Sequence, residues 1–153
     1  ASGGHVAAVH HLCHAGADPD VASHHCPTPL LAAATAGHLQ AVQRLMEARA
    51  TVNRTQKVGC TPLHAAASHG WPEVTTCLCQ ARADMRTTTA SGYTPVLAAC
   101  EQGHLEVVRQ LCMALADVNR EAKGGSTPSH AAASTGHVDV LQVLAEVRAD
   151  LDR

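Results

Sequence analysis

The stretch Thr61-Pro62-Leu63-His64-Ala65-Ala66-Ala67 decides how this chain folds. Thr61 is a favourable helix N-cap, and Pro62 suits the first helical position, where its missing N–H is no loss. The alanine-rich residues that follow predict a short helix over 63–68, which Gly70 ends in the left-handed conformation. His64 stands three residues after the cap, and from there its imidazole reaches back to the cap as a capping-box Glu does.

A second helix and a hairpin complete this unit. Residues 72–81 are expected to be helical, because Val74 and Leu78 recur at the spacing of one apolar stripe. The polar residues 87–91, which end at Gly92, predict a turn or a β-hairpin. Two short antiparallel helices and a hairpin cannot enclose a core alone, so the unit needs copies stacked beside it.

These copies recur at a period of 33 residues. Thr-Pro pairs and Gly-His or Gly-Trp pairs keep this period in phase along the whole chain. The Thr-Pro pairs begin at Thr28, Thr61, Thr94 and Thr127, and the glycine pairs at Gly4, Gly37, Gly70, Gly103 and Gly136. We therefore expect a single domain over 1–153, made of a C-terminal half-repeat (1–22) and four repeats (23–55, 56–88, 89–121 and 122–153).

The period and the motif at Thr61 resemble those of the ankyrin repeat. The other three Thr-Pro pairs match the motif with substitutions, and the likeness covers essentially the whole chain. The resemblance implies an all-α fold, an α-solenoid of stacked helix-turn-helix repeats with connecting β-hairpin loops. It also implies a non-catalytic module that binds a protein partner through its hairpin tips and its concave inner-helix face.

The repeats depart from the family pattern where the second helix ends. The family usually has Gly there, whereas Arg49, Arg82, Leu115 and Arg148 occupy the later positions. If these sites stay left-handed, each non-Gly residue costs roughly 1 kcal/mol. We therefore expect a domain of modest stability.

The resemblance also indicates which residues contact a partner. By repeat position they lie on the hairpin tips and at the exposed ends of the first helices. Tyr93 has the largest weight, because an exposed Tyr offers rigid amphipathic contact area. The expected partner-binding residues are Lys57, Val58, Ser68, His69, Ala90, Ser91, Tyr93, Glu101, Gln102, Lys123, Ser126, Ser134 and Thr135.

Composition and net charge indicate which classes of partner, compartment and core to expect. The 153 residues have a net charge of -2, which argues against nucleic acid or an anionic membrane surface as the main partner. No apolar run approaches the roughly 18 residues of a membrane span. Seven cysteines, an odd number, favour a reducing compartment, the cytoplasm or the nucleus. Only Trp71 and Tyr93 are aromatic, so the core is expected to consist of Ala, Leu and Val.

Motifs for catalysis are absent from the sequence. There is no phosphate-binding loop, nucleophile elbow or zinc-protease helix, so we expect neither an enzyme nor a cofactor. His10 and His14 lie four apart on the second helix of the half-repeat and can face one ligand. A solvated helix face explains both more simply. A weak histidine-dependent metal site and a purely structural spacer remain alternatives to partner binding.

Single residues carry further expectations. We expect four cysteines to act as small core hydrophobes: Cys13, Cys79, Cys100 and Cys112. Cys26 and Cys60 are expected to be exposed, oxidisable thiols. Trp71 is expected to pack across the seam between repeats. Asn119, with Leu111, Asp117 and Val118, resembles asparagines that are hydroxylated in some ankyrin repeats. The chain opens without Met in the middle of a repeat, so we expect a monomeric piece of a longer repeat protein.

Overall fold

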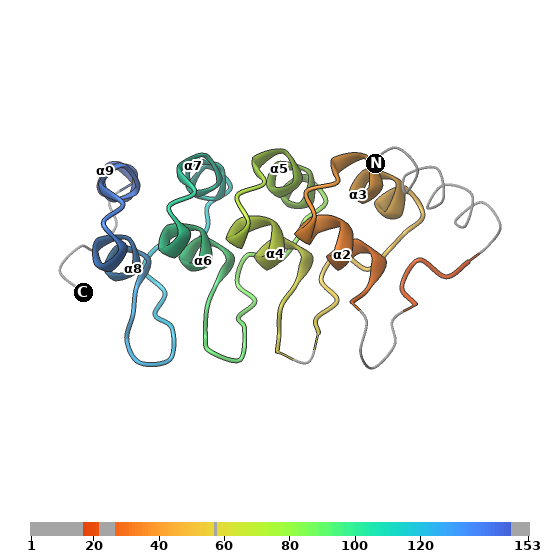
Figure 1. Ribbon diagram of the computed structural model, residues 1–153, viewed down its shortest axis with the longest axis horizontal. Helices are drawn as coiled ribbons and strands as arrows, with labels where there is room; N and C mark the ends of the chain where they lie inside the picture. Colours follow the sequence, from red (N-terminus) through yellow and green to blue (C-terminus); the bar gives the residue numbers. More distant parts are fainter. Residues whose placement is uncertain (1–16, 22–26, 57, 148–153) are drawn as a thin grey trace.

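The computed structural model, which describes residues 17–21, 27–56 and 58–147, is a row of helix pairs (Figure 1). Eight helices lie in the described residues, and none of those residues is in a β-strand. The pairs are α2 (Pro29–Thr35) with α3 (Leu39–Glu47), α4 (Pro62–Ser68) with α5 (Pro72–Gln80), α6 (Pro95–Gln102) with α7 (Leu105–Met113), and α8 (Pro128–Thr135) with α9 (Val138–Glu146).

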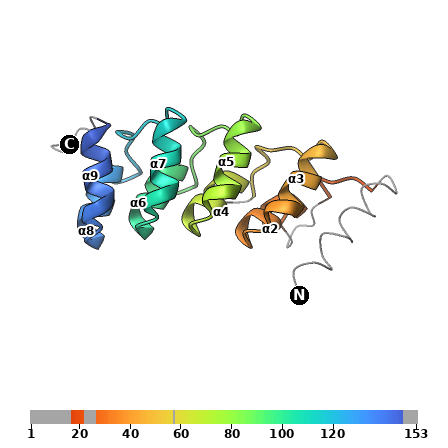
Figure 2. The same cartoon turned by 90° about the horizontal axis from the view of Figure 1, so that it is seen from above.

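The pairs stack side by side in two layers. The first helices α2, α4, α6 and α8 contact one another in order, and the second helices α3, α5, α7 and α9 do the same (Figure 2). The loops between pairs all project to one side, below the first helices in Figure 1. The all-α solenoid expected from the sequence is therefore confirmed.

Turn hydrogen bonds rather than strands close the hairpin loops. The N–H of Thr89 donates to the carbonyl of Tyr93 at 3.0 Å, and the N–H of Gly92 donates to the carbonyl of Thr89 at 2.8 Å. The loop between α3 and α4 closes in the same way. The expected hairpins are present as turns, and no strand extends them within the described residues.

Each first helix begins at a Thr-Pro pair, as predicted. The threonine hydroxyl oxygen accepts a backbone N–H three residues further on, which satisfies one of the donors left unpaired at a helix start. This cap is formed by Thr28, Thr61, Thr94 and Thr127. His64 and His130 complete the capping box at their helices, which confirms the role expected for these imidazoles.

His64 also joins its helix pair to the next one. Its Nδ1 accepts the N–H of Thr61 at 3.3 Å, so the proton is on Nε2, which donates to the carbonyl oxygen of Tyr93 at 2.9 Å. Burial lowers the pKa of His64, because a charged imidazole would lose its hydration there. The neutral ring therefore serves as both a cap and a link between pairs.

The core is a thin apolar seam between the two layers. Its largest fully buried side chains are all Leu or Val, and the alanines of the first helices fill the space between pairs. Cys100 is fully buried among them, as expected for a small hydrophobe. The prediction of a core built without large rings is confirmed for the described residues.

Ring side chains seal the seam on one face. The indole of Trp71 lies so close to Gly37 that a Cβ there would come within 2.6 Å of the ring, and its Nε1–H donates to the carbonyl of Thr35 at 3.0 Å. The imidazole of His104 covers Gly70 in the same manner. The seam position expected for Trp71 is confirmed.

The second helices end in left-handed residues that are not glycine. Arg49, Arg82 and Leu115 have φ values of 65°, 60° and 65°. The expectation of strained helix ends is therefore confirmed at these three positions. Arg148 lies outside the described residues.

Candidate binding surface

The hairpin tips form a row that backbone hydrogen bonds tie together. The N–H of Ala90 donates to the carbonyl of Val58 at 2.8 Å, and the N–H of Lys123 donates to the carbonyl of Ser91 at 3.0 Å. All four side chains are exposed. The tips therefore hold their side chains at fixed spacing while leaving them open to solvent. Lys57, which was expected beside Val58, lies outside the described residues.

The exposed ends of the first helices supply the second group of expected contact residues. His69, Gln102, Ser134 and Thr135 are exposed, and Ser68 is half-buried. The hydroxyls of Ser134 and Thr135 donate to a carbonyl of their own helix at 2.9 and 2.8 Å. These side chains are accessible, although part of their hydrogen-bonding capacity is used within the helix.

Tyr93 is half-buried rather than exposed as expected. Its ring packs against a small apolar cluster that contains Leu97 and Ala122. Its hydroxyl donates to Oε1 of Glu101 at 2.9 Å, and this hydrogen bond raises the pKa of Tyr93. The bond joins a hairpin to the exposed end of α6, so the two groups of expected contact residues adjoin here. Ser126, at the base of the next hairpin, is half-buried.

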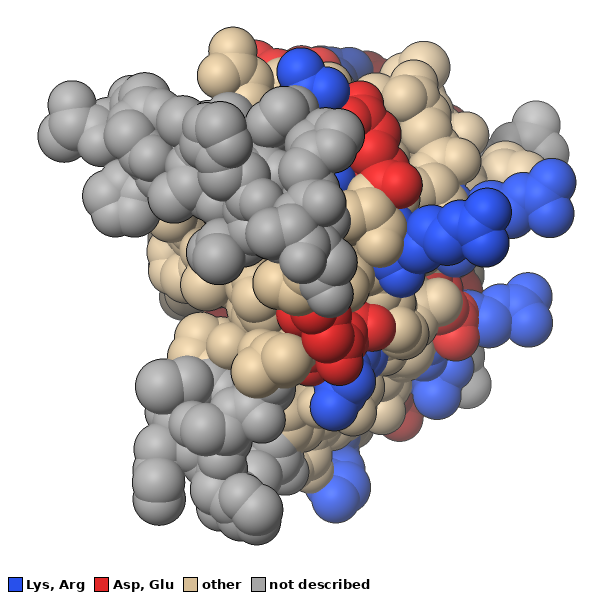
Figure 3. Space-filling view, turned by 90° about the vertical axis from the view of Figure 1, so that its right-hand side faces the viewer, with Lys and Arg blue, Asp and Glu red and all other residues tan. Residues whose placement is uncertain are grey.

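Charges of both signs are distributed over the surface. In the view of Figure 3, onto the α2–α3 end, Lys and Arg side chains project along one edge, and Asp and Glu side chains lie beside them. Among the described residues the one ion pair joins Arg44 and Glu47, at 2.9 Å. The described residues at this end therefore do not produce the single-sign field that attracts a highly charged partner.

Cys60 does not fit the expectation of an exposed thiol. Its side chain is half-buried, and burial raises the pKa of the thiol, which lowers the fraction of reactive thiolate. Burial likewise raises the pKa of Cys100, with a smaller contribution from Cys112. Cys79 and Cys112 are half-buried against the core. Cys13 and Cys26 lie outside the described residues.

Asn119 is half-buried, and its backbone N–H donates to Oδ1 of Asp117 at 3.0 Å. Asn53, two periods earlier, accepts the N–H of Asp84 at 2.8 Å, so an amide at this position connects successive repeats. Hydroxylation of Asn119 stays a prediction.

The metal hypothesis rests on His10 and His14, which lie outside the described residues. Elsewhere, in the ranges that the structure describes, no three His, Cys, Asp or Glu side chains gather in a way that could hold a metal ion. Nor does any described helix have the length and apolar character needed to cross a membrane.

Sequence reasoning missed a groove on the opposite layer. It lies between α5 and α7 and has a volume of about 600 Å³. The sequence carried a signal for it, since Met113 and Leu115 stand where the other repeats have Glu or Gln and Arg, respectively. Seven residues line the groove: Thr76, Cys79, Gln80, Glu106, Gln110, Met113 and Ala114.

Comparison with known families agrees with the stacked helix pairs. The family model for ankyrin repeats (three copies) matches residues 1–89 and 72–153. The chain therefore belongs to the ankyrin-repeat family, whose members are generally non-catalytic modules for protein–protein interaction. No curated protein matches the chain significantly.

Proposed function

We propose that this chain is a non-catalytic module that binds a protein partner along its hairpin tips and the exposed ends of its first helices. The row of tips tied by backbone hydrogen bonds carries the proposal, because it presents exposed side chains on a fixed frame. A preformed surface binds with less loss of conformational freedom than a flexible one. In this proposal the surface side chains bind the partner and do not take part in a reaction.

The expected partner surface is polar and of mixed charge. Lys123 is exposed on a tip, and Glu101 is half-buried with its carboxylate engaged by Tyr93. We propose a protein rather than nucleic acid or a membrane as the partner, because the net charge of -2 offers little attraction to polyanions. We further propose that the domain acts as a monomer in the cytoplasm or the nucleus.

Affinity capture from a cell lysate tests this function. The test variant combines Val58→Glu, His69→Ala and Lys123→Glu, which change exposed side chains and leave the backbone hydrogen bonds of the tips in place. The control combines Arg109→Glu and Gln142→Ala, both exposed on second helices. Circular dichroism should be the same for all three proteins.

Proteins that the original chain and the control retain, and that the test variant loses, would support binding at the tips. An identical set for all three proteins would contradict the proposal. It would instead favour a domain that only spaces other parts of a longer protein.

A further inference from the structure

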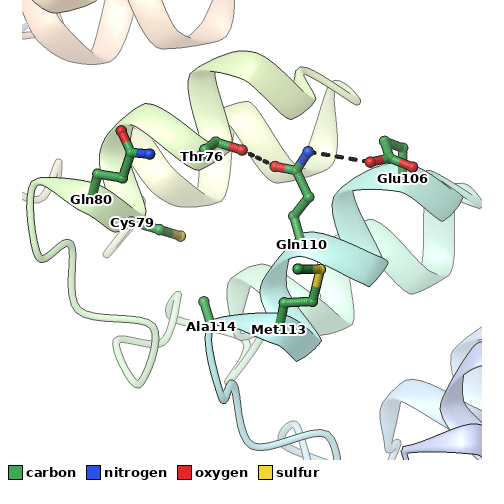
Figure 4. Close-up of a pocket in the computed structure, with 7 residues that line it drawn as sticks. All are labelled: Thr76, Cys79, Gln80, Glu106, Gln110, Met113 and Ala114. Atoms are coloured by element: carbon green, nitrogen blue, oxygen red, sulfur yellow. Dashed lines mark hydrogen bonds between the residues drawn. The ribbon is translucent and has the colours of Figure 1, made fainter.

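The groove between α5 and α7 has one polar and one apolar end (Figure 4). At the polar end a chain of hydrogen bonds crosses between the helices. The Thr76 hydroxyl donates to Oε1 of Gln110, whose Nε2–H donates to Oε1 of Glu106 at 3.3 Å. At the other end Cys79 on α5 faces Met113 and Ala114 on α7 and forms an apolar wall with them, and the amide of Gln80 lies near Cys79.

Glu106 is the one charged residue of the groove lining. Its side chain is exposed, and within the described ranges it contacts the neutral amide of Gln110 but no cation. A carboxylate beside an apolar wall is complementary to a Lys or Arg of a partner. The groove therefore has a defined charge preference.

Met113 and Leu115 are unusual for their positions. Met113 is 83% exposed, where the other repeats have Glu47, Gln80 and Glu146. Leu115 is 89% exposed and left-handed, so it combines backbone strain with no burial of its side chain. Neither side chain contributes its apolar surface to the core, which leaves that surface available to another molecule.

The corresponding surface of α3 has a different character. It is lined by Gln40, Gln43, Arg44 and Glu47, and its two charges pair with each other at 2.9 Å. That surface is polar, and its positive and negative charges neutralise each other. Glu73 on α5 and Asp139 on α9 are acidic at the position of Glu106, so the exposed apolar side chain of Met113 is what distinguishes the α5–α7 groove.

We propose that the α5–α7 groove is a docking site, separate from the hairpin tips, for a peptide segment of another protein. The segment places an apolar side chain against Met113 and a Lys or Arg beside Glu106. A peptide suits the site better than a small molecule, because small-molecule sites enclose most of their ligand, whereas Glu106, Gln80 and Met113 are all exposed. A short amphipathic helix laid between two helices is an established mode of recognition.

A random-peptide display library tests the site directly. Peptides are selected on the original chain and counter-selected on Met113→Gln, which installs the residue that Gln80 provides one period earlier. Selected peptides are then titrated into protein with ¹³C-labelled methionine methyl groups. The three methionines make this readout simple, because Met46 and Met85 are half-buried and serve as internal references.

We expect the enriched peptides to combine an apolar residue with Lys or Arg within one helical turn and to shift the Met113 signal alone. Met113→Gln should weaken binding about tenfold, because the apolar contact is lost. Glu106→Gln should weaken it about threefold, as for an exposed ion pair. Glu146→Gln, at the position of Met113 on α9, should bind like the original chain. The tip variant Val58→Glu/Lys123→Glu should do the same, which separates this site from the tips.

Three results would overturn the proposal. The first is a selection that enriches no peptide over the Met113→Gln counter-target. The second is enrichment of peptides without basic residues, with Glu106→Gln leaving affinity unchanged. The third is a shift of the Met113 signal with protein concentration alone, together with a dimer in sedimentation, because a second copy would then occupy the groove.

Discussion

The helix pairs α4–α5 and α8–α9 begin with nearly the same motif but differ in what surrounds it. One starts Thr61-Pro62-Leu63-His64 and the other Thr127-Pro128-Ser129-His130, and both form a capping box. Within the described residues α4–α5 is packed between two other pairs, whereas α8–α9 contacts one. His64 is 2% exposed, while His130 is exposed.

The difference shows which properties belong to the motif and which to the neighbour. Capping is local, so both threonine–histidine pairs achieve it. Burial of the ring and its second hydrogen bond depend on the following hairpin, which His64 meets at Tyr93. The same residues therefore contribute more to stability between two pairs than at one side of the stack.

The largest effect is expected from exchanging the third residue of the motif. Leu63 is 1% exposed in the core, whereas Ser129 is buried with its hydroxyl unpartnered. Leu63→Ser should lower the free energy of unfolding by about 4 kcal/mol, because it leaves a cavity and buries a polar group. Ser129→Val, which copies Val96, should raise it by about 1 kcal/mol. Urea denaturation followed by circular dichroism measures both, and equal effects of opposite sign would contradict the comparison.

The next effect concerns the glycine that ends each first helix. Gly70 and Gly136 have φ values of +73° and +79°, so Ala at either position is strained by about 1 kcal/mol. A Cβ on Gly70 would also lie 2.5 Å from Nδ1 of His104, whereas nothing lies within 4 Å of one on Gly136. Gly70→Ala should therefore cost about 1–2 kcal/mol more than Gly136→Ala, since the ring must move and the hydrogen bond between its Nε2 and the Ser68 carbonyl oxygen (3.1 Å) weakens. Thermal or urea unfolding that gives the same cost for both would show that the ring does not seal the seam.

A smaller effect is expected from pH. The folded-state pKa of His64 lies below the unfolded value of about 6.5, so the unfolded chain takes up a proton first as the pH falls. The contribution of neutral His64 to the free energy of unfolding is fully present above about pH 6.5. It decreases below that pH, with a slope of at most about 1.4 kcal/mol per pH unit. His64→Leu, which copies Leu31 and Leu97, should flatten this slope in urea titrations at pH values above and below about 6.5. His130→Leu is the matched control and should keep the slope of the original chain, because it does not touch His64.

The smallest effect should come from the ends of the second helices. Replacing Arg82 or Leu115 by Gly removes left-handed strain and should raise the free energy of unfolding by about 0.5–1 kcal/mol each. The gain should be similar at Arg49, because this strain is local and does not depend on the neighbouring pair. A loss of stability on Leu115→Gly would mean that the exposed side chain makes contacts that the structure does not show.

Much of the fold was predictable from particular residues. The Thr-Pro pairs fixed where helices start, because a hydroxyl cap and a missing N–H act within a few residues. Gly70 predicted the end of α4. The non-glycine residues Arg49, Arg82 and Leu115 predicted backbone strain at the ends of the second helices, and their positive φ values confirm it. The general location of the expected contact residues was also predictable, since the position of a residue within the repeat places it on a hairpin tip or at the end of a first helix.

The finer features of the surface were not predictable in this way. Tyr93 was expected to be exposed, yet its hydroxyl finds Glu101 eight residues further on, across the turn between a hairpin and a helix. Cys60 was expected to be an exposed thiol, yet the packing around its hairpin half-buries it. Both errors have one cause, because repeat position gives a residue's place in its unit but not the side chains that pack against it.

The sequence by itself determined the period, the capping of each first helix, the left-handed turns and membership of the ankyrin-repeat family. These properties depend on residues close together in the chain or on exact repetition. Only the tertiary structure decided which copies of a motif are buried, how Glu106 and Met113 combine with Thr76 and Cys79 into a groove, and which thiols are shielded. Such properties arise where one helix pair meets the next, and a contact between residues some 33 positions apart is set by packing rather than by local conformation.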